Sequence, residues 1–186
     1  SIDLSTKDRG FKDRYIIFYG MLNSTANIDS YRFLIENIYD KIEPILERFN
    51  YKIYVVGRGK NNLYKDYKYL KIIGDVDSIY QTIADSEFVF LPLRVGSGTR
   101  TRILEAAFVK KAVLTTTIGA EGLEFNDNEL LTYDNIDDIV NSFYRLVEDE
   151  DFRDRLGKNL YKKAIQKYLD KNVAKELVDL VEQIDK

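Results

Sequence analysis

Short apolar runs alternate along the chain with segments in which apolar residues recur at helical spacing. The runs are rich in Val, Ile, Tyr and Phe, and three of them are followed directly by a glycine. Nearly continuous apolar runs of this length are typical of strands that are buried on both faces of a parallel sheet. The predicted strands span residues 15–19, 51–56, 69–73, 88–93 and 112–115, with 129–132 as a sixth.

Helical periodicity fills the segments between and after these runs. One face of the first helix is expected to carry Ile38, Ile42, Ile45, Leu46 and Phe49. Asp29 is expected to cap this helix, and Pro44 to break or kink it near Ile42. Further helices are predicted at residues 77–84, 99–109, 136–147, 152–168 and 173–184. Strands that alternate with helices predict an α/β fold: an open, mostly parallel sheet of about six strands, with helices on both faces and closing C-terminal helices.

The composition fits one domain and narrows the possible chemistry. The chain has 186 residues, 45% of them hydrophobic, which is enough for a core without covalent staples. It contains no Cys and no His, which excludes disulfides, thiolate and histidine metal sites, and nucleophiles activated by histidine. The net charge of -3 gives no basic face for nucleic acid, and no apolar stretch approaches a membrane span. The polar residues 1–14 are expected to be a linker from a missing N-terminal domain.

Four glycine-bearing loops follow the predicted strands. They contain Gly20, residues 57–60, residues 74–76 and residues 96–100. In an open α/β sheet, ligands bind at the carboxyl ends of the strands, and glycine lets the backbone approach a ligand closely. The alternative is that these glycines only close tight turns.

The Gly-Ser-Gly-Thr-Arg sequence at residues 96–100 joins a strand to a helix. The free N–H groups and the positive end of that helix favour a bound phosphate. Arg100 is poorly placed at a helix N-terminus unless an anion lies between them, and arginine suits bidentate contact with phosphate. The alternative is that Arg100 and Arg102 only form surface ion pairs.

Glu105 lies on the next turn of the same predicted helix, in an otherwise apolar stretch. A buried carboxylate is costly without partners, and paired sugar hydroxyls would satisfy it. The alternative is a salt bridge to a neighbouring Lys or Arg. The Asp75-Val76-Asp77 sequence matches a metal-binding pattern of some sugar transferases, but helix capping by Asp77 is the favoured interpretation.

Several of these segments, in this order, resemble the group 1 glycosyltransferases. Residues 91–107, LPLRVGSGTRTRILEAA, are similar to the family signature, and residues 112–123 to the strand and loop that follow it. Residues 55–59 and 73–76 fall where the family has the ends of its second and third strands. Residues 149–157 resemble the segment that precedes the family's closing helices. The resemblance implies that residues 15–186 are the Rossmann-like, C-terminal donor-binding domain of a two-domain GT-B enzyme.

The resemblance also assigns roles to residues. It implies that Glu105 holds the ribose hydroxyls, that Val76 reads the nucleobase through its backbone, and that Gly20 approaches the diphosphate. Arg100 and Glu105 are the residues expected to act in catalysis. The full set of expected donor-binding residues is Gly20, Arg58, Lys60, Val76, Gly96, Ser97, Gly98, Thr99, Arg100 and Glu105.

The implied enzyme is a hexosyltransferase of polysaccharide or glycoconjugate biosynthesis that retains the anomeric configuration. It would use a nucleotide-diphosphate sugar as substrate, with no cofactor and no metal, and its acceptor would be bound by the missing domain. The expected partners do not include nucleic acid. The expected location is the cytoplasm, with any membrane contact left to the missing half, and this fragment alone is expected to be inactive.

Two positions depart from the family pattern. Ser97 replaces the first glutamate of the family's glutamate pair, so the backbone of residues 96–98 would have to hold the sugar. Residues 24–27, STAN, stand where many relatives carry an Arg and a Lys for the diphosphate, and Arg100, Arg58 or Lys60 are the candidates to replace that charge. Two alternatives stay open: a sugar-nucleotide epimerase of the same architecture, and a degenerate interaction domain, which Ser97 favours.

Overall fold

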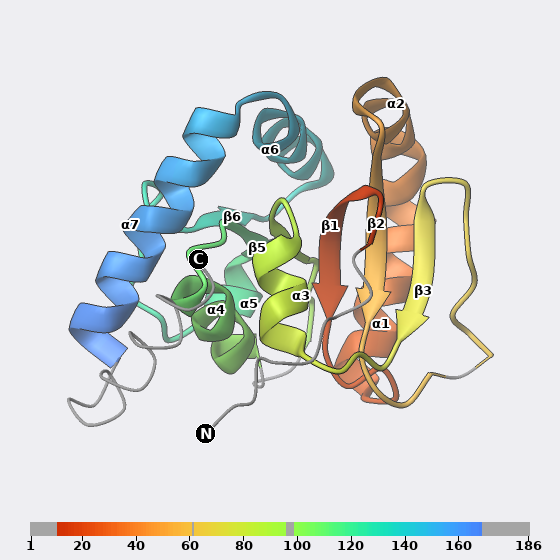
Figure 1. Cartoon of the computed structure of the whole chain (residues 1–186), viewed down its shortest axis with the longest axis horizontal. Coiled ribbons are helices and arrows are strands. Elements are labelled where there is room, and N and C mark those ends of the chain that lie inside the picture. Colours follow the sequence, from red (N-terminus) through yellow and green to blue (C-terminus); the bar gives the residue numbers. More distant parts are fainter. Residues whose placement is uncertain (1–10, 61, 96–98, 169–186) are drawn as a thin grey trace.

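The computed structural model describes residues 11–60, 62–95 and 99–168, and for residues 99 and 100 it describes the backbone alone. Its centre is a six-stranded sheet in the order β3-β2-β1-β4-β5-β6, with every neighbouring pair parallel (Figure 1). The predicted α/β architecture is confirmed. The strands are β1 (Arg14–Tyr19), β2 (Tyr51–Val56), β3 (Leu70–Gly74), β4 (Val89–Leu91), β5 (Val113–Thr116) and β6 (Leu131–Tyr133).

Helices cover both faces of this sheet. In Figure 1, α3, α4 and α7 lie in front of the strands, and α1, α2 and α6 lie behind them. The elements are α1 (Thr25–Phe33), a π-helical turn η1 (Leu34–Ile38), α2 (Tyr39–Phe49), α3 (Ile79–Asp85), α4 (Thr99–Phe108), α5 (Thr117–Ala120), α6 (Ile136–Glu148) and α7 (Glu150–Tyr168). The predicted last helix, at residues 173–184, lies outside the described residues.

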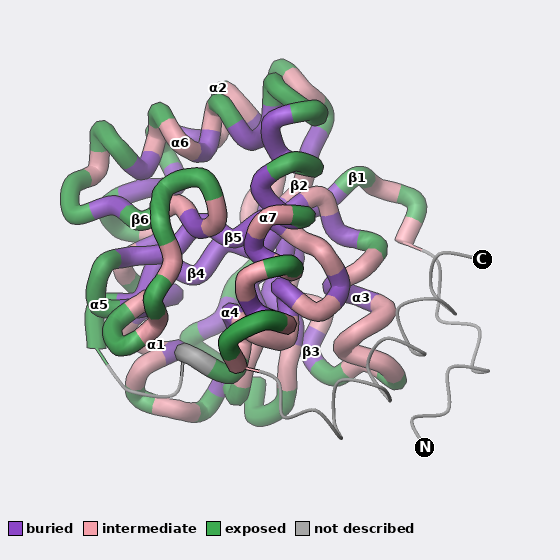
Figure 2. The backbone as a smooth tube through the Cα atoms, turned by 90° about the vertical axis from the view of Figure 1, so that its left-hand side faces the viewer, coloured by how far each residue is buried: buried purple, intermediate pink, exposed green. Residues whose placement is uncertain are grey.

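Two apolar layers result from the strand alternation, because successive side chains of a strand point to opposite faces. On β1, Ile16 and Phe18 join the layer under α1, α2 and α6, whereas Ile17 and Tyr19 join the layer under α3, α4 and α7. Figure 2 shows β4 and β5 buried along their whole length between these layers. The last residue of β1, Tyr19, therefore faces α4, which carries Glu105.

The helix caps differ from the expected ones at two positions. The first helix begins at Thr25, and its cap is Ser24, whose hydroxyl accepts a hydrogen bond from the Asn27 N–H at 3.3 Å. Asp29 lies inside that helix and instead binds Arg94 through both carboxylate oxygens. Ser78, and not Asp77, caps α3. In both cases a serine close to the aspartate has the extended backbone that an N-cap requires.

Pro44 does not break its helix. It lies inside α2, and the irregular turn is found earlier, at Leu34–Ile38, where the Tyr39 N–H donates to the Leu34 carbonyl. Ile42 and Leu46 are fully buried on either side of the proline. Because packing of the apolar face supplies most of the stability of a helix in a protein, it holds α2 together across the missing hydrogen bond.

A single residue, Asp149, separates the last two described helices, α6 and α7. Asp149 caps α7 by accepting a hydrogen bond from the Phe152 N–H at 2.8 Å. The apolar side chains of α7 contribute to both core layers, Leu156 to one and Leu160 to the other, so the helix closes the domain at the edge of the sheet. Within the described residues, no helix is both long enough and apolar enough to cross a membrane.

Candidate functional site

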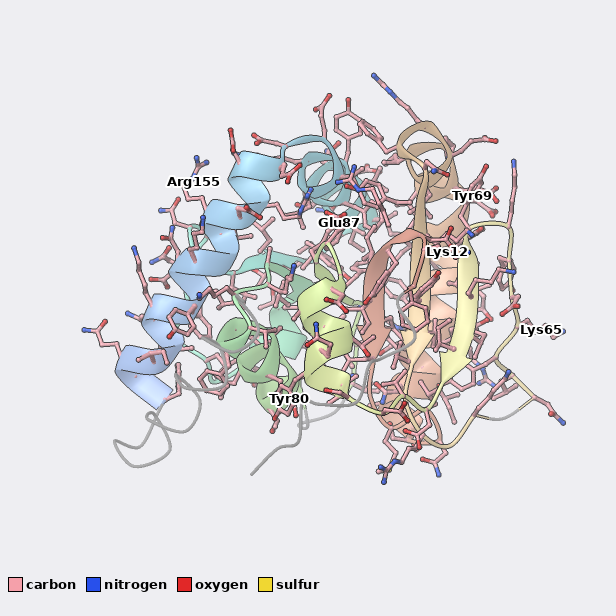
Figure 3. All side chains as sticks on the ribbon, in the orientation of Figure 1. Lys12, Lys65, Tyr69, Tyr80, Glu87 and Arg155 are labelled. Atoms are coloured by element: carbon pink, nitrogen blue, oxygen red, sulfur yellow. The ribbon has the colours of Figure 1, made fainter. Side chains whose placement is uncertain are left out.

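A cleft of 760 Å³ opens at the carboxyl ends of β1, β2 and β3, beside α4. Figure 3 labels Tyr80 on α3 near this end of the molecule and Glu87 near the opposite end. The cleft is lined by Tyr19, Gly20, Met21, Ser24, Ala26, Asn27, Val56, Gly57, Arg58, Asp75, Val76, Asp77, Ile79, Thr101, Arg102 and Glu105. Gly20, Arg58, Val76 and Glu105 of the sequence prediction therefore share one cavity. A second groove, of 440 Å³, lies between α6 and α7 and contains none of the predicted residues.

Two glycines let the ends of β1 and β2 touch. Gly20 has φ 146° and Gly57 has φ 141°. A Cβ on Gly57 would lie 1.8 Å from the Gly20 carbonyl oxygen, and a Cβ on Gly20 would lie 2.7 Å from the Asn27 amide nitrogen. Both positions therefore require glycine for close approach. Gly74, by contrast, has open space around its Cβ position, so there only the backbone conformation, with φ 82°, calls for glycine.

Glu105 lies on α4 with its carboxylate at the cleft, and no cation lies within 4.0 Å of it among the described side chains. Burial raises the pKa of this carboxyl, and a hydrogen bond from Tyr19 and the charge of Arg102 oppose that rise. The Tyr19 hydroxyl has a single proton, which this carboxylate shares with the Arg102 carbonyl oxygen, 2.5 Å from the hydroxyl oxygen. Glu105 therefore has a shared hydrogen bond from Tyr19 and the more distant charge of Arg102, but no salt bridge to a described side chain, and its carboxylate keeps capacity to accept hydrogen bonds in the cleft.

Arg102 is a second partly buried charge in this cleft. Its Nη1 donates to the Tyr19 carbonyl oxygen at 2.9 Å and to the Asn27 Oδ1 at 2.7 Å. Burial lowers the pKa of its guanidinium. No carboxylate of the described residues lies within 4.0 Å of it, so the expected alternative of a surface ion pair does not hold for Arg102.

A comparison with known protein families shows to which family this chain belongs. The family model described as "Glycosyl transferases group 1" matches residues 13–149. The chain belongs to the group 1 glycosyltransferases. No curated protein sequence is significantly similar to the chain.

Solved structures share the fold of this group 1 domain. TarM matches with a TM-score of 0.67 and 17% identity, over 91% of this chain and 35% of its own. Anabaena HepE, solved with UDP and glucose, matches with a TM-score of 0.70 and 15% identity, over 91% and 48%. The C-terminal domain of LpcC from Francisella tularensis matches with a TM-score of 0.63 and 19% identity, over 84% and 86%. The chain therefore spans about a third to a half of the first two proteins.

The other residues of the expected donor-binding set do not all line the cleft. Arg58 is 79% exposed at the edge of the cleft, where its Nε lies 3.3 Å from the Asp75 carboxylate. Lys60 is exposed and is not among the residues that line the cleft. Gly96, Ser97 and Gly98 lie outside the described residues. Thr99 and Arg100 begin α4, which matches the predicted helix start, and only their backbone is described.

Sequence reasoning missed three residues of this site: Tyr19, Asn27 and Arg102. A usable signal for Arg102 was its spacing of three residues from Glu105, which places two residues on one helix face. Tyr19 could have been found from the strand alternation, since it ends β1 on the side of Ile17. Asn27 carried no signal. Among the described residues, no group of three or more acidic side chains could hold a metal ion.

Proposed function

We propose that this chain is the donor-binding half of a glycosyltransferase that transfers a sugar from a nucleotide-diphosphate sugar to an acceptor, with retention of configuration. The observation that carries the proposal is the carboxylate of Glu105, which is desolvated in the cleft and has no cation within 4.0 Å among the described side chains. Two relatives of the same fold were solved with UDP: Anabaena HepE with UDP and glucose, and S. aureus TarM with UDP and an α-GlcNAc-glycerol.

The chemistry of the cleft fits a nucleoside diphosphate. A carboxylate accepts two hydrogen bonds side by side, so Glu105 suits the neighbouring hydroxyls of a ribose. Gly20 and Gly57, at the ends of β1 and β2, line the cleft and carry no side chain, so a phosphate can approach the backbone at these two positions. The first turn of α4 lies beside the cleft, and its free N–H groups favour an anion. The leaving diphosphate gains charge during transfer, and such groups stabilise it.

The direct test is binding of UDP, GDP, ADP and dTDP by isothermal titration calorimetry. At least one of them is expected to bind, and Glu105→Gln and Glu105→Ala are expected to weaken that binding about tenfold or more, because a hydrogen bond to a charged group is worth about 1.5–3 kcal/mol. Arg100→Ala is expected to weaken it comparably. Glu36→Gln, which changes an exposed glutamate of η1, is the matched control and should bind like the wild type.

Two outcomes would contradict the proposal. If no nucleoside diphosphate binds the wild type, the cleft is not a donor site and the interaction-domain alternative gains support. If one binds but Glu105→Gln binds it equally well, Glu105 does not hold the ribose. Transfer itself requires the acceptor half, and product analysis with the longer protein separates a glycoside, which we expect, from the free epimerised sugar of an epimerase.

A further inference from the structure

The diphosphate subsite of this domain lacks charge where the chain leaves β1. A diphosphate carries several negative charges, and in a cleft they need cationic partners. Residues 24–27, Ser-Thr-Ala-Asn, hold no charged side chain. A cation has to reach the cleft from another element.

Two described cations line the cleft, Arg58 and Arg102. Arg58 is largely exposed and already lies beside the carboxylate of Asp75, so its charge is both solvated and paired. Arg102 is partly buried, and no carboxylate of the described residues lies within 4.0 Å of its guanidinium. Of these two, Arg102 is the one without a salt bridge to a described carboxylate, and only the more distant charge of Glu105 acts on it.

The guanidinium of Arg102 lies directly against the missing side chain of Gly20. A Cβ on Gly20 would be 2.9 Å from Nη1, so glycine leaves this cation uncovered at the end of β1. Nη1 is used by the Tyr19 carbonyl oxygen and by Asn27. Among the described residues, no acceptor takes the Nε or Nη2 donors, and these form the edge with which arginine binds a phosphate in bidentate fashion.

Asn27 fixes the orientation of this group. It is 3% exposed, its Nδ2 donates to the Met21 carbonyl oxygen at 2.7 Å, and its Oδ1 accepts from Arg102. Both ends of the amide are therefore committed, and the side chain presents an oxygen, without a charge, to the guanidinium. A carboxylate in this place would neutralise Arg102, whereas the amide orients it and leaves its charge intact.

We infer that Arg102 of α4 supplies the cation that binds the donor diphosphate, with Asn27 as its positioning residue. The inference rests on the proposed function, since it assigns a subsite within that cleft. The cation in this chain comes from the helix that also carries Glu105, three residues further on. Ribose and diphosphate would thus be held by two side chains of α4, whose relative position is fixed by the helix.

The test is a comparison of UDP with uridine in wild type and Arg102→Gln, or of the matching pair for whichever base the panel selects. The wild type is expected to prefer the diphosphate. Arg102→Gln should lose about 10- to 100-fold in affinity for UDP, the range of a hydrogen bond to a charged group, and stay within about twofold for uridine. The salt dependence of UDP binding should also weaken, because one charge contact is gone. Arg32→Gln, which changes an exposed arginine of α1 that does not line the cleft, is the matched control and should keep both affinities within about threefold.

Asn27→Asp provides a second variant that does not depend on how Arg102→Gln folds. It places a carboxylate against the guanidinium, so UDP binding should fall about tenfold or more while uridine binding is kept. Equal loss of UDP and uridine in both variants would mean that Arg102 only maintains the cleft, and would overturn the inference. So would Arg100→Gln abolishing the UDP preference while Arg102→Gln keeps it. A wild type that binds no nucleoside diphosphate instead refutes the proposed function.

Discussion

A buried arginine, Arg153, and a partly buried one, Arg102, lie at opposite ends of the sheet, and they are held in different ways. Arg153 of α7 has a side chain that is 4% exposed, and it lies near the amino ends of the strands beside Glu87, which Figure 3 labels. Its Nη2 lies 2.7 Å from the Glu87 carboxylate, and its Nη1 donates to the Leu146 carbonyl oxygen. Arg102 lies at the carboxyl ends of the strands, and among the described residues its guanidinium donates hydrogen bonds only to neutral oxygens.

The difference is the one expected between a charge that stabilises the fold and a charge that binds a ligand. Burying a charge costs free energy, and a carboxylate partner recovers part of that cost within the protein. Arg153 recovers it from Glu87, which also accepts from Arg14 at 2.8 Å and so ties α7 to the start of β1. Arg102 recovers less of it, because Glu105 acts on its charge without a direct salt bridge, as expected where a ligand supplies the anion. Stability should therefore depend on Arg153, and binding on Arg102.

Replacing Arg153 should have the largest effect on stability. Arg153→Met removes one member of a buried ion pair, and we expect a loss of about 3 kcal/mol, at the low end for such pairs because Arg14 still faces Glu87. For a chain of this length that lowers Tm by about 6–12 °C. Urea and thermal unfolding measure it, with Arg155→Met, an exposed arginine of the same helix, as the control. If the two variants are equally stable, Arg153 does not stabilise the fold, and the contrast with Arg102 fails.

Gly20→Ala tests whether the ligand uses the space between Gly20 and the guanidinium of Arg102. The new Cβ would lie 2.9 Å from Nη1 of Arg102 and 2.7 Å from Nδ2 of Asn27, at a backbone φ of 146°. We expect a cost of about 2 kcal/mol from strain and displacement, together with loss of UDP binding.

Gly74→Ala is the matched control for that substitution. It carries backbone strain at φ 82°, but nothing lies within 4 Å of the new Cβ. It should lower stability by about 1–3 kcal/mol and leave the UDP affinity unchanged. Wild-type UDP binding by Gly20→Ala would show that the space beside Gly20 is not used by the ligand.

Much of this fold was readable from the sequence because parallel strands buried on both faces leave a simple signal. All six strands and the helix from Thr99 were predicted to within a few residues. The errors were local: a cap was assigned to Asp29, and a break to Pro44. The cap depends on whether Asp29 or Ser24 begins the helix, and the hydrophobic pattern alone does not decide between them. The break at Pro44 depends on whether the packing of Ile42 and Leu46 outweighs the lost hydrogen bond, which the pattern does not decide either.

The site was readable only in part. Glu105 was predicted because a carboxylate in an apolar stretch is a visible anomaly, and Gly20 because a glycine ends a strand. Arg102 and Asn27 were not, since their roles follow from a contact between residues 75 positions apart. The spacing of Arg102 from Glu105 places both residues on one face of the helix, but only the contact with Asn27 shows that the guanidinium lies at the end of β1.

Replacing Arg102 should have little effect on stability, which sharpens the contrast with Arg153. Arg102→Gln loses the hydrogen bonds to the Tyr19 carbonyl and to Asn27, but it also removes a desolvated charge. The two effects oppose each other, so we expect a change within about 1 kcal/mol, against about 3 kcal/mol for Arg153→Met. Urea unfolding of the ligand-free proteins measures both. A loss for Arg102→Gln as large as for Arg153→Met would make both arginines structural.

The smallest effect concerns Glu105 and depends on pH. Burial raises the pKa of this carboxyl in the folded state, so between the unfolded and the folded pKa the folded protein binds more protons than the unfolded one. Stability from this group is therefore present at low pH and is lost as pH rises through the folded pKa. The amide of Glu105→Gln does not titrate, and the variant should be more stable than the wild type at pH 7 by less than about 1 kcal/mol, or about 1–3 °C in Tm. The gap should close as pH falls below about 4.3, the ordinary pKa of a glutamate. Thermal unfolding of both proteins between pH 4 and 8 measures this difference in Tm. If the wild type is instead the more stable protein at pH 7, Glu105 has a cationic partner in the free protein. Its charge would then stabilise the fold, as that of Arg153 does.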